Sequence, residues 1–121
     1  MQITYTQVLT LYQNDTGPIL QAAFLELDEN TVVSLVGYGG WFSFWVPGAA
    51  PHIVRAAAVN GALGLVTYTP KGDEFASLGD LRYQATVMHP DYTENASTAS
   101  GRGYFTLSGP VCRAVVVRKP T

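Results

Sequence analysis

The chain has 121 residues and one cysteine, which favours one domain with one hydrophobic core and excludes an intrachain disulfide. Charged residues make up 13% of the chain, about half of the roughly 25% in average proteins, so uncharged polar residues must cover much of the surface. The net charge is −2 and the Lys and Arg residues are scattered, so no basic surface is available to neutralise phosphates, and we expect no nucleic-acid partner.

The first half of the chain predicts short strands separated by turns. Residues 3–13 are rich in β-branched and aromatic residues and predict a strand, or two short ones. Their alternation of polar and apolar residues is unlike a signal peptide, and no apolar run reaches the ~20 residues of a membrane helix, so we expect no membrane partner. The turn "NDTGP" follows. Further strands are expected at 19–28, within 31–40, and at 41–46.

The second half continues the same pattern. Residues 81–89 alternate cleanly, with Leu81, Tyr83, Ala85, Val87 and His89 on one face. The loop before them holds the one segment that favours a short helical turn, around Glu74–Leu78. The other expected strands are 53–59, 63–69, 103–108 and 111–119. About eight short strands with almost no helical periodicity predict a single all-β domain over 1–121, an antiparallel β-sandwich or small barrel.

The triplet Asp15-Thr16-Gly17 is the catalytic sequence of aspartic proteases, which makes a homodimeric protease using Asp15 an alternative function. In such enzymes two carboxylates meet across the dimer axis and share a proton. Here Asn14 precedes the triplet and Pro18, which lacks an N–H, follows it. Three residues are weak evidence, so we favour a turn in which Asp15 or Thr16 accepts a hydrogen bond and Gly17 has an unusual backbone angle.

An aromatic cluster occupies the stretch "YGGWFSFW". On a strand, Trp41 and Trp45 share one face, whereas Phe42 and Phe44 share the other. We expect the phenylalanines to fill the core. Because Trp is enriched at protein interfaces, we interpret the tryptophans, together with Tyr38, as candidate contact residues. A carbohydrate-binding module that stacks Trp41 or Trp45 on sugar is a further alternative.

No other motif supports catalysis or a cofactor. The two histidines, His52 and His89, are far apart in sequence, and Cys112 lies in an alternating run where we expect it to pack as a small apolar side chain. No Gly-x-Ser-x-Gly elbow and no phosphate-binding loop is present. We therefore expect a protein that is not an enzyme, with no metal and no cofactor.

Several short motifs occur in a fixed order along residues 8–108. They are the turn Asp28–Asn30, the step Ser34–Gly37 into an aromatic strand, and the strands Gly64–Tyr68, Leu81–Val87 and Gly103–Leu107. In this order and spacing, the chain resembles the amino-terminal domain of the phage baseplate upper protein family. The resemblance implies an Ig-like β-sandwich of about seven to nine strands. Family members often continue into a stalk or receptor-binding extension, whereas this sequence ends at Thr121, and we do not expect an adaptor role.

The resemblance also implies a structural protein of a bacteriophage particle, made in the host cytoplasm and assembled into the baseplate or tail tip. Its expected partners are other virion structural proteins and copies of itself. Aromatic residues in loops and on strands are the candidate contacts, namely Tyr38, Trp41, Trp45 and Tyr92. A capsid decoration or cement protein with the same fold is an alternative location on the particle.

Overall fold

The computed structural model describes residues 2–5, 10–26, 28, 31–49, 52–89 and 106–118. These residues form nine strands and one 3-10 turn, η1 (Asp73–Phe75). The strands are β1 (Gln2–Tyr5), β2 (Thr10–Tyr12), β3 (Leu20–Leu25), β4 (Gly39–Trp45), β5 (Ile53–Asn60), β6 (Leu65–Tyr68), β7 (Gly79–Met88), β8 (Thr106–Ser108) and β9 (Cys112–Val117). The predicted all-β class is confirmed, and residues 3–13 supply two strands rather than one.

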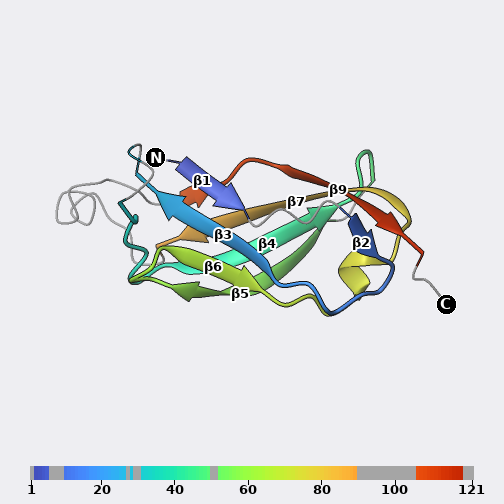
Figure 1. Cartoon of the computed structure of the whole chain (residues 1–121), viewed down its shortest axis with the longest axis horizontal. Helices are drawn as coiled ribbons and strands as arrows, with labels where there is room; N and C mark the ends of the chain where they lie inside the picture. The colour runs from blue at the N-terminus through green and yellow to red at the C-terminus, as the bar shows by residue number, and fades with distance from the viewer. Residues whose placement is uncertain are drawn as a thin grey trace.

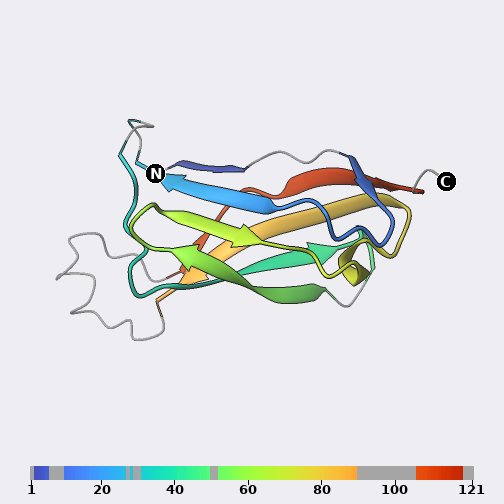
Figure 2. The ribbon, with the colours of Figure 1, turned by 60° about the horizontal axis from the view of Figure 1, so that its bottom comes forward.

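The strands form two facing layers (Figures 1 and 2). They follow one hydrogen-bonded path, β1-β3-β6-β5-β4-β7-β9-β2, and β8 pairs with the end of β7. Strand β5 joins the layers, because residues 53–57 pair with β4 and residues 58–60 pair with β6. One layer is thus β1-β3-β6-β5 and the other β4-β7-β9. When the strands are numbered in chain order, these two layers have the same strand order as the two sheets of an Ig-like sandwich.

One strand pair departs from the antiparallel expectation. Strand β2 pairs in parallel with β9, placing Thr10 opposite Val115 and Tyr12 opposite Val117. The amino-terminal segment first pairs with β3 in one layer and then with β9 in the other. Strands β1 and β2 run in the same direction although they pair in different layers, and β9 also runs in that direction. The sheet is therefore mixed.

The short strand expected within residues 31–40 is absent, and the glycines expected to form a bend, Gly39 and Gly40, instead begin β4. Val32 forms only an isolated bridge with Leu25. The N–H groups of Val33 and Leu35 donate instead to the carbonyls of Phe24 (2.9 Å) and Gly61 (2.9 Å). This segment crosses from one layer to the other, so its donors find different acceptors in turn and no continuous ladder forms.

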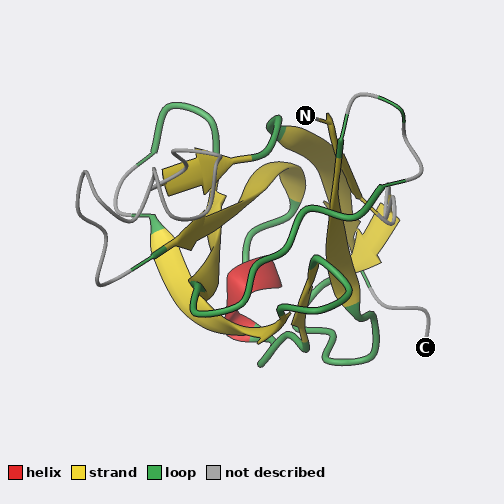
Figure 3. Cartoon of the chain, turned by 90° about the vertical axis from the view of Figure 1, so that its left-hand side faces the viewer, coloured by secondary structure: helices red, strands yellow, loops and turns green. Residues whose placement is uncertain are grey.

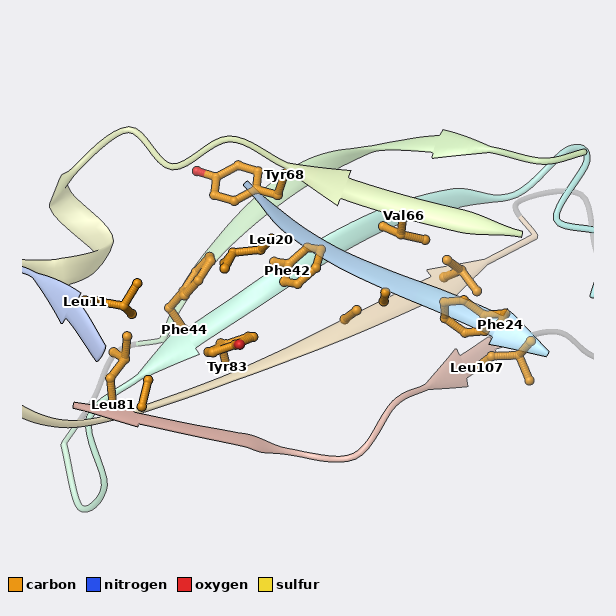
Figure 4. Close-up of a cluster of buried hydrophobic side chains, with 14 of the residues drawn as sticks. Leu11, Leu20, Phe24, Phe42, Phe44, Val66, Tyr68, Leu81, Tyr83 and Leu107 are labelled. Atoms are coloured by element: carbon orange, nitrogen blue, oxygen red, sulfur yellow. The ribbon is translucent and has the colours of Figure 1, made fainter. Parts of the chain in front are cut away.

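Alternation along the strands builds the core between the layers (Figure 4). Phe42 and Phe44 on β4 are buried, and their ring centroids lie 6.3 Å apart. The ring of Tyr83 on β7 packs at 6.4 Å and 6.2 Å from them. Burying each aromatic side chain contributes about 1.5–3 kcal/mol. On the face predicted for residues 81–89, Leu81, Tyr83, Ala85 and Val87 are buried, whereas His89, which follows β7, is partly exposed. Leu20, Ala22 and Phe24 of β3 are also buried.

The turn η1 lies between the two layers in an end view (Figure 3). Phe75 is fully buried there and meets the Phe44 ring edge-on at 6.0 Å. Gly72, which precedes the turn, has φ +108° and lies so close to the carbonyl oxygen of Asn14 that a Cβ would be 2.9 Å from it. The expected helical turn around Glu74–Leu78 is therefore present as a shorter element that begins one residue earlier.

Candidate interaction face

The outward side of β4 carries the residues that sequence analysis selected as contacts. Trp41, Ser43 and Trp45 alternate with the buried phenylalanines and are each partly exposed. Strand pairing fixes their neighbours on the same face, because directly opposed residues point to the same side of a sheet. We name this surface the tryptophan face; it comprises Trp41, Ser43 and Trp45 of β4, Val54 and Ala56 of β5, and Arg82, Gln84 and Thr86 of β7.

Small neighbours flank the first indole, which is partly exposed. Trp41 lies opposite Ala56 on one side and Thr86 on the other. Neither side chain is long enough to cover an indole. The Thr86 hydroxyl is engaged with the Ser108 hydroxyl at 3.1 Å, which draws it toward β8. Trp41 thus presents part of its ring to solvent although it sits mid-sheet.

The second indole is held in place by a loop residue. The rings of Trp45 and His52 stack with centroids 4.9 Å apart and an interplanar angle of 15°. His52 immediately precedes β5, so the turn between β4 and β5 positions it over the end of β4. An offset aromatic pair of this kind contributes about 0.5–1.5 kcal/mol. Trp45 is consequently pre-organised, and little conformational entropy would be lost when a partner covers it.

Charge is confined to one end of the tryptophan face. Its central residues are uncharged, whereas Arg82 lies beside Trp45 and directly opposite Arg113 of β9. No ion pair joins either arginine to an acidic residue in the described ranges. An uncharged surface with aromatic side chains is desolvated at low cost, which is the composition of an interface core.

Both indoles retain a polar group. Within the described part of the chain, neither the Trp41 nor the Trp45 N–H has a hydrogen-bond acceptor. Indole N–H groups usually find an acceptor when they become buried. The face can therefore supply two hydrogen-bond donors as well as apolar area.

The other predicted contact residues are not brought to this face. Tyr38 packs against the core cluster and meets the ring of His89 edge-on at 5.2 Å. It precedes β4 on the side that faces inward, away from Trp41 and Trp45. Tyr92 lies outside the described residues. Of the four candidates, Trp41 and Trp45 thus share one face of the sheet.

The Asp15-Thr16-Gly17 stretch forms a turn in the structure. The Asp15 carboxylate accepts a hydrogen bond from the Gly17 N–H at 3.0 Å, and the Asp15 N–H donates to the Tyr12 carbonyl at 3.1 Å. The unusual backbone angle is at Asn14, with φ 59°, instead of at Gly17, because Asn tolerates the left-handed region where the chain reverses after β2. Strand β3 starts at Leu20, two residues beyond Pro18.

The residues considered for metal or nucleophilic chemistry are separated in the fold. His52 stacks on Trp45 and His89 contacts Tyr38 at different sites. Among the described residues, no three His, Cys, Asp or Glu side chains are grouped to hold a metal ion. Cys112 is half-buried, and this burial raises the pKa of its thiol. In the ranges described, no helix is long and apolar enough to cross a bilayer.

Sequence reasoning missed a buried carboxylate. Glu74 is 4% exposed and accepts hydrogen bonds from the Tyr68 hydroxyl and from the N–H groups of Lys71 (3.0 Å) and Gly72 (2.8 Å). Burial raises the pKa of Glu74, but these hydrogen bonds outweigh that effect and hold the pKa below its usual value. Burial, followed by the bond to Glu74, raises the pKa of Tyr68. This pair anchors the loop that carries η1.

No protein-family model matches the chain, and no curated protein matches it.

Proposed function

We propose that the chain is a non-catalytic structural protein of a bacteriophage particle, a component of the baseplate or tail tip that acts by packing on neighbouring subunits. The observation that carries this proposal is the tryptophan face. Two partly exposed indoles, Trp41 and Trp45, lie on one strand among uncharged neighbours, with both N–H donors unused in the described chain. Such a surface binds by area and shape.

Two further observations support packing in an assembly. Only 13% of residues are charged, which suits a protein whose surface is largely covered by neighbours. The ordered motifs between residues 8 and 108 resemble the amino-terminal domain of the phage baseplate upper protein family, and this resemblance supplies the phage context. The proposed partners are other virion proteins and copies of this chain.

The test is incorporation into particles. Two phage variants are made in which this gene is mutated. One carries Trp41→Ala together with Trp45→Ala, and the other carries Leu63→Ala as the matched control. Leu63 is 55% exposed in the turn between β5 and β6, away from the tryptophan face. We expect the double variant to be produced folded but to be lost from purified particles, whereas Leu63→Ala is retained. Wild-type copy numbers of the double variant would contradict the proposal.

Electron microscopy of particles that lack the protein separates the two virion locations. Loss of a feature at the tail end supports the baseplate, and loss of knobs from the capsid supports the decoration protein. The protease alternative rests on Asp15, whose carboxylate is bonded to the Gly17 N–H. If Asp15→Asn abolished cleavage of virion proteins, the proposal of a non-catalytic role would fail.

A further inference from the structure

Two arginines lie side by side at one end of the tryptophan face. Arg82 of β7 is directly opposite Arg113 of β9, and Trp45 of β4 lies opposite Arg82 on its other side. Opposed residues of antiparallel strands point to the same side of the sheet, with Cβ atoms about 4.5–5.5 Å apart. The arginines alternate with Tyr83 and Ala114, which are buried, so the row of three side chains lies on the outward face.

The positive charge of this row is not neutralised by the described part of the chain. Like charges that face each other on neighbouring strands destabilise a sheet. Nevertheless, neither Arg82 nor Arg113 forms an ion pair within the described ranges, where the acidic partner of an arginine is Asp73, bound to Arg55. The chain has nine Asp and Glu residues against seven Lys and Arg, so the lack of a partner does not reflect a shortage of acidic residues. Two adjacent guanidinium groups are thus available to an external anion.

A hollow of about 310 Å³ adjoins the two arginines and also contains an acidic group. Its lining is Asp80, Arg82, Arg113, Ala114 and Val115. Asp80 lies opposite Val115 on the same outward face, two residues along β7 from Arg82. With two arginines and one aspartate, the hollow keeps an excess of one positive charge. An anion that enters would therefore be attracted by the arginines and repelled by Asp80.

The anion that suits this arrangement is a single carboxylate. A guanidinium binds a carboxylate through two parallel hydrogen bonds, and two neighbouring guanidinium groups can share its two oxygens. The rest of the tryptophan face is uncharged, so it offers no continuing row of cations to a polyanion. Trp45 lies beside Arg82, and an apolar group next to the carboxylate would pack there. An Asp or Glu side chain on a protein surface has this combination.

A different protein supplies such a side chain more readily than a second copy of this chain. Apart from Asp80, which is on the same surface, the solvent-accessible carboxylates of the described ranges are engaged within their own chain. Asp15 and Asp28 accept hydrogen bonds from backbone N–H groups, and Asp73 is paired with Arg55. A second copy would have to break these contacts before it could bind.

We propose that the Arg82–Arg113 pair binds the carboxylate of an Asp or Glu side chain on another virion protein, which packs beside Trp45. This inference rests on the proposed function and specifies the chemistry of the partner at one end of the tryptophan face. Truncating one side of a charge pair that is buried in an interface weakens binding strongly, mainly through faster dissociation.

The test is retention of the protein on purified particles washed with increasing concentrations of NaCl. Arg82→Gln together with Arg113→Gln should lower the retained copy number by about tenfold or more. The matched control, Arg118→Gln, changes an exposed arginine outside the row and should be retained as the wild type is. Asp80→Asn removes the repelling carboxylate and should raise the NaCl concentration needed for release. Urea unfolding of each purified variant verifies its fold, which relief of the Arg–Arg repulsion should not weaken.

Charge reversal identifies the source of the carboxylate. Phage that carry Arg82→Glu together with Arg113→Glu are selected for recovered growth and sequenced. We expect suppressors that replace an Asp or Glu of another virion protein by Lys or Arg. Suppressors at acidic residues of this chain would instead identify a second copy as the partner and overturn the proposal.

The particle assay separates failure of this inference from failure of the proposed function. If the Trp41→Ala, Trp45→Ala variant is lost from particles but the double glutamine variant is retained as Arg118→Gln is, the inference alone is overturned. The same conclusion follows if Asp80→Asn weakens retention as much as the arginine changes do. If the wild-type chain is absent from particles, the proposed function fails, and this inference fails with it.

Discussion

The two faces of β4 carry aromatic residues in opposite circumstances. Phe42 and Phe44 are 0% and 1% exposed, whereas Trp41 and Trp45 on the same strand are partly exposed. An antiparallel strand with one solvated face usually places polar side chains outward. The fold requires the inner pair because they fill the space between the layers. The outer pair does not fill this space, and it is the surface on which the proposed partner would pack.

The strongest test of this contrast substitutes one residue from each face. Phe44→Ala should reduce the free energy of unfolding by about 3–5 kcal/mol, because it leaves a cavity beside Phe42, Tyr83 and Phe75. Trp45→Ala should reduce it by only about 1 kcal/mol, mainly through loss of stacking on His52. Urea denaturation measures both values. Equal reductions in the free energy of unfolding would show that Trp45 is a core residue, and the two faces of β4 would then not differ.

The segment between β8 and β9 allows a similar test where β1 of one layer meets the other layer. Gly109 is buried, and a Cβ there would overlap the Tyr5 hydroxyl and approach Ile3. Gly109→Ala should therefore cost about 1–3 kcal/mol of stability by overpacking. Tyr5→Phe in the same chain removes the overlapping atom. Thermal or urea unfolding of the double variant should show a smaller loss than the sum of the single variants; a strictly additive result would contradict the packing described.

Substitution of the buried Glu74 tests whether the interior of the protein also depends on polar groups for its stability. Glu74→Gln should cost about 1–3 kcal/mol near neutral pH, because the loop N–H groups of Lys71 and Gly72 lose their charged acceptor. Since the folded-state pKa of Glu74 is lowered, its contribution is present above the unfolded pKa of about 4.3 and is lost as pH falls through the folded value. Urea midpoints measured from pH 7 to pH 2 should fall more steeply in the wild type than in Glu74→Gln.

The smallest expected effect concerns Tyr5. Burial raises the pKa of its hydroxyl to about 12. A raised folded-state pKa stabilises the protein below the unfolded value of about 10, and this contribution disappears as pH rises from about 10 toward 12. Tyr5→Phe should cost about 1 kcal/mol at pH 7 by leaving the Ala85 N–H unpaired, and should flatten the decline in stability above pH 10. Parallel alkaline profiles for both proteins would refute this.

Local patterns predicted the parts of the fold that depend on side-chain alternation. The burial of Phe42 and Phe44, with Trp41 and Trp45 on the opposite face, follows from the period of two along a strand. The turn at Asp15 follows from the tendency of an Asp side chain to accept a hydrogen bond from the backbone N–H two residues later. Each prediction involves residues close together in sequence.

Features that depend on distant segments were not predictable in the same way. The parallel pairing of β2 with β9 arises because the amino-terminal segment changes layers, which no local pattern encodes. Burial of Glu74 depends on Tyr68 and on a loop folded around the carboxylate, whereas the sequence displays only a charged residue in a polar stretch. The close approach of Gly109 to Tyr5 likewise requires β1 from the opposite layer.

We propose that a partner covers the parts of Trp41 and Trp45 that the chain leaves exposed. Hydroxyl-radical footprinting, with oxidation of each residue measured by mass spectrometry, tests this in the free protein and in purified particles. We expect both tryptophans to be readily oxidised in the free protein and several-fold protected in particles, while exposed Leu63 changes little. Equal oxidation of both tryptophans in the two samples would contradict it.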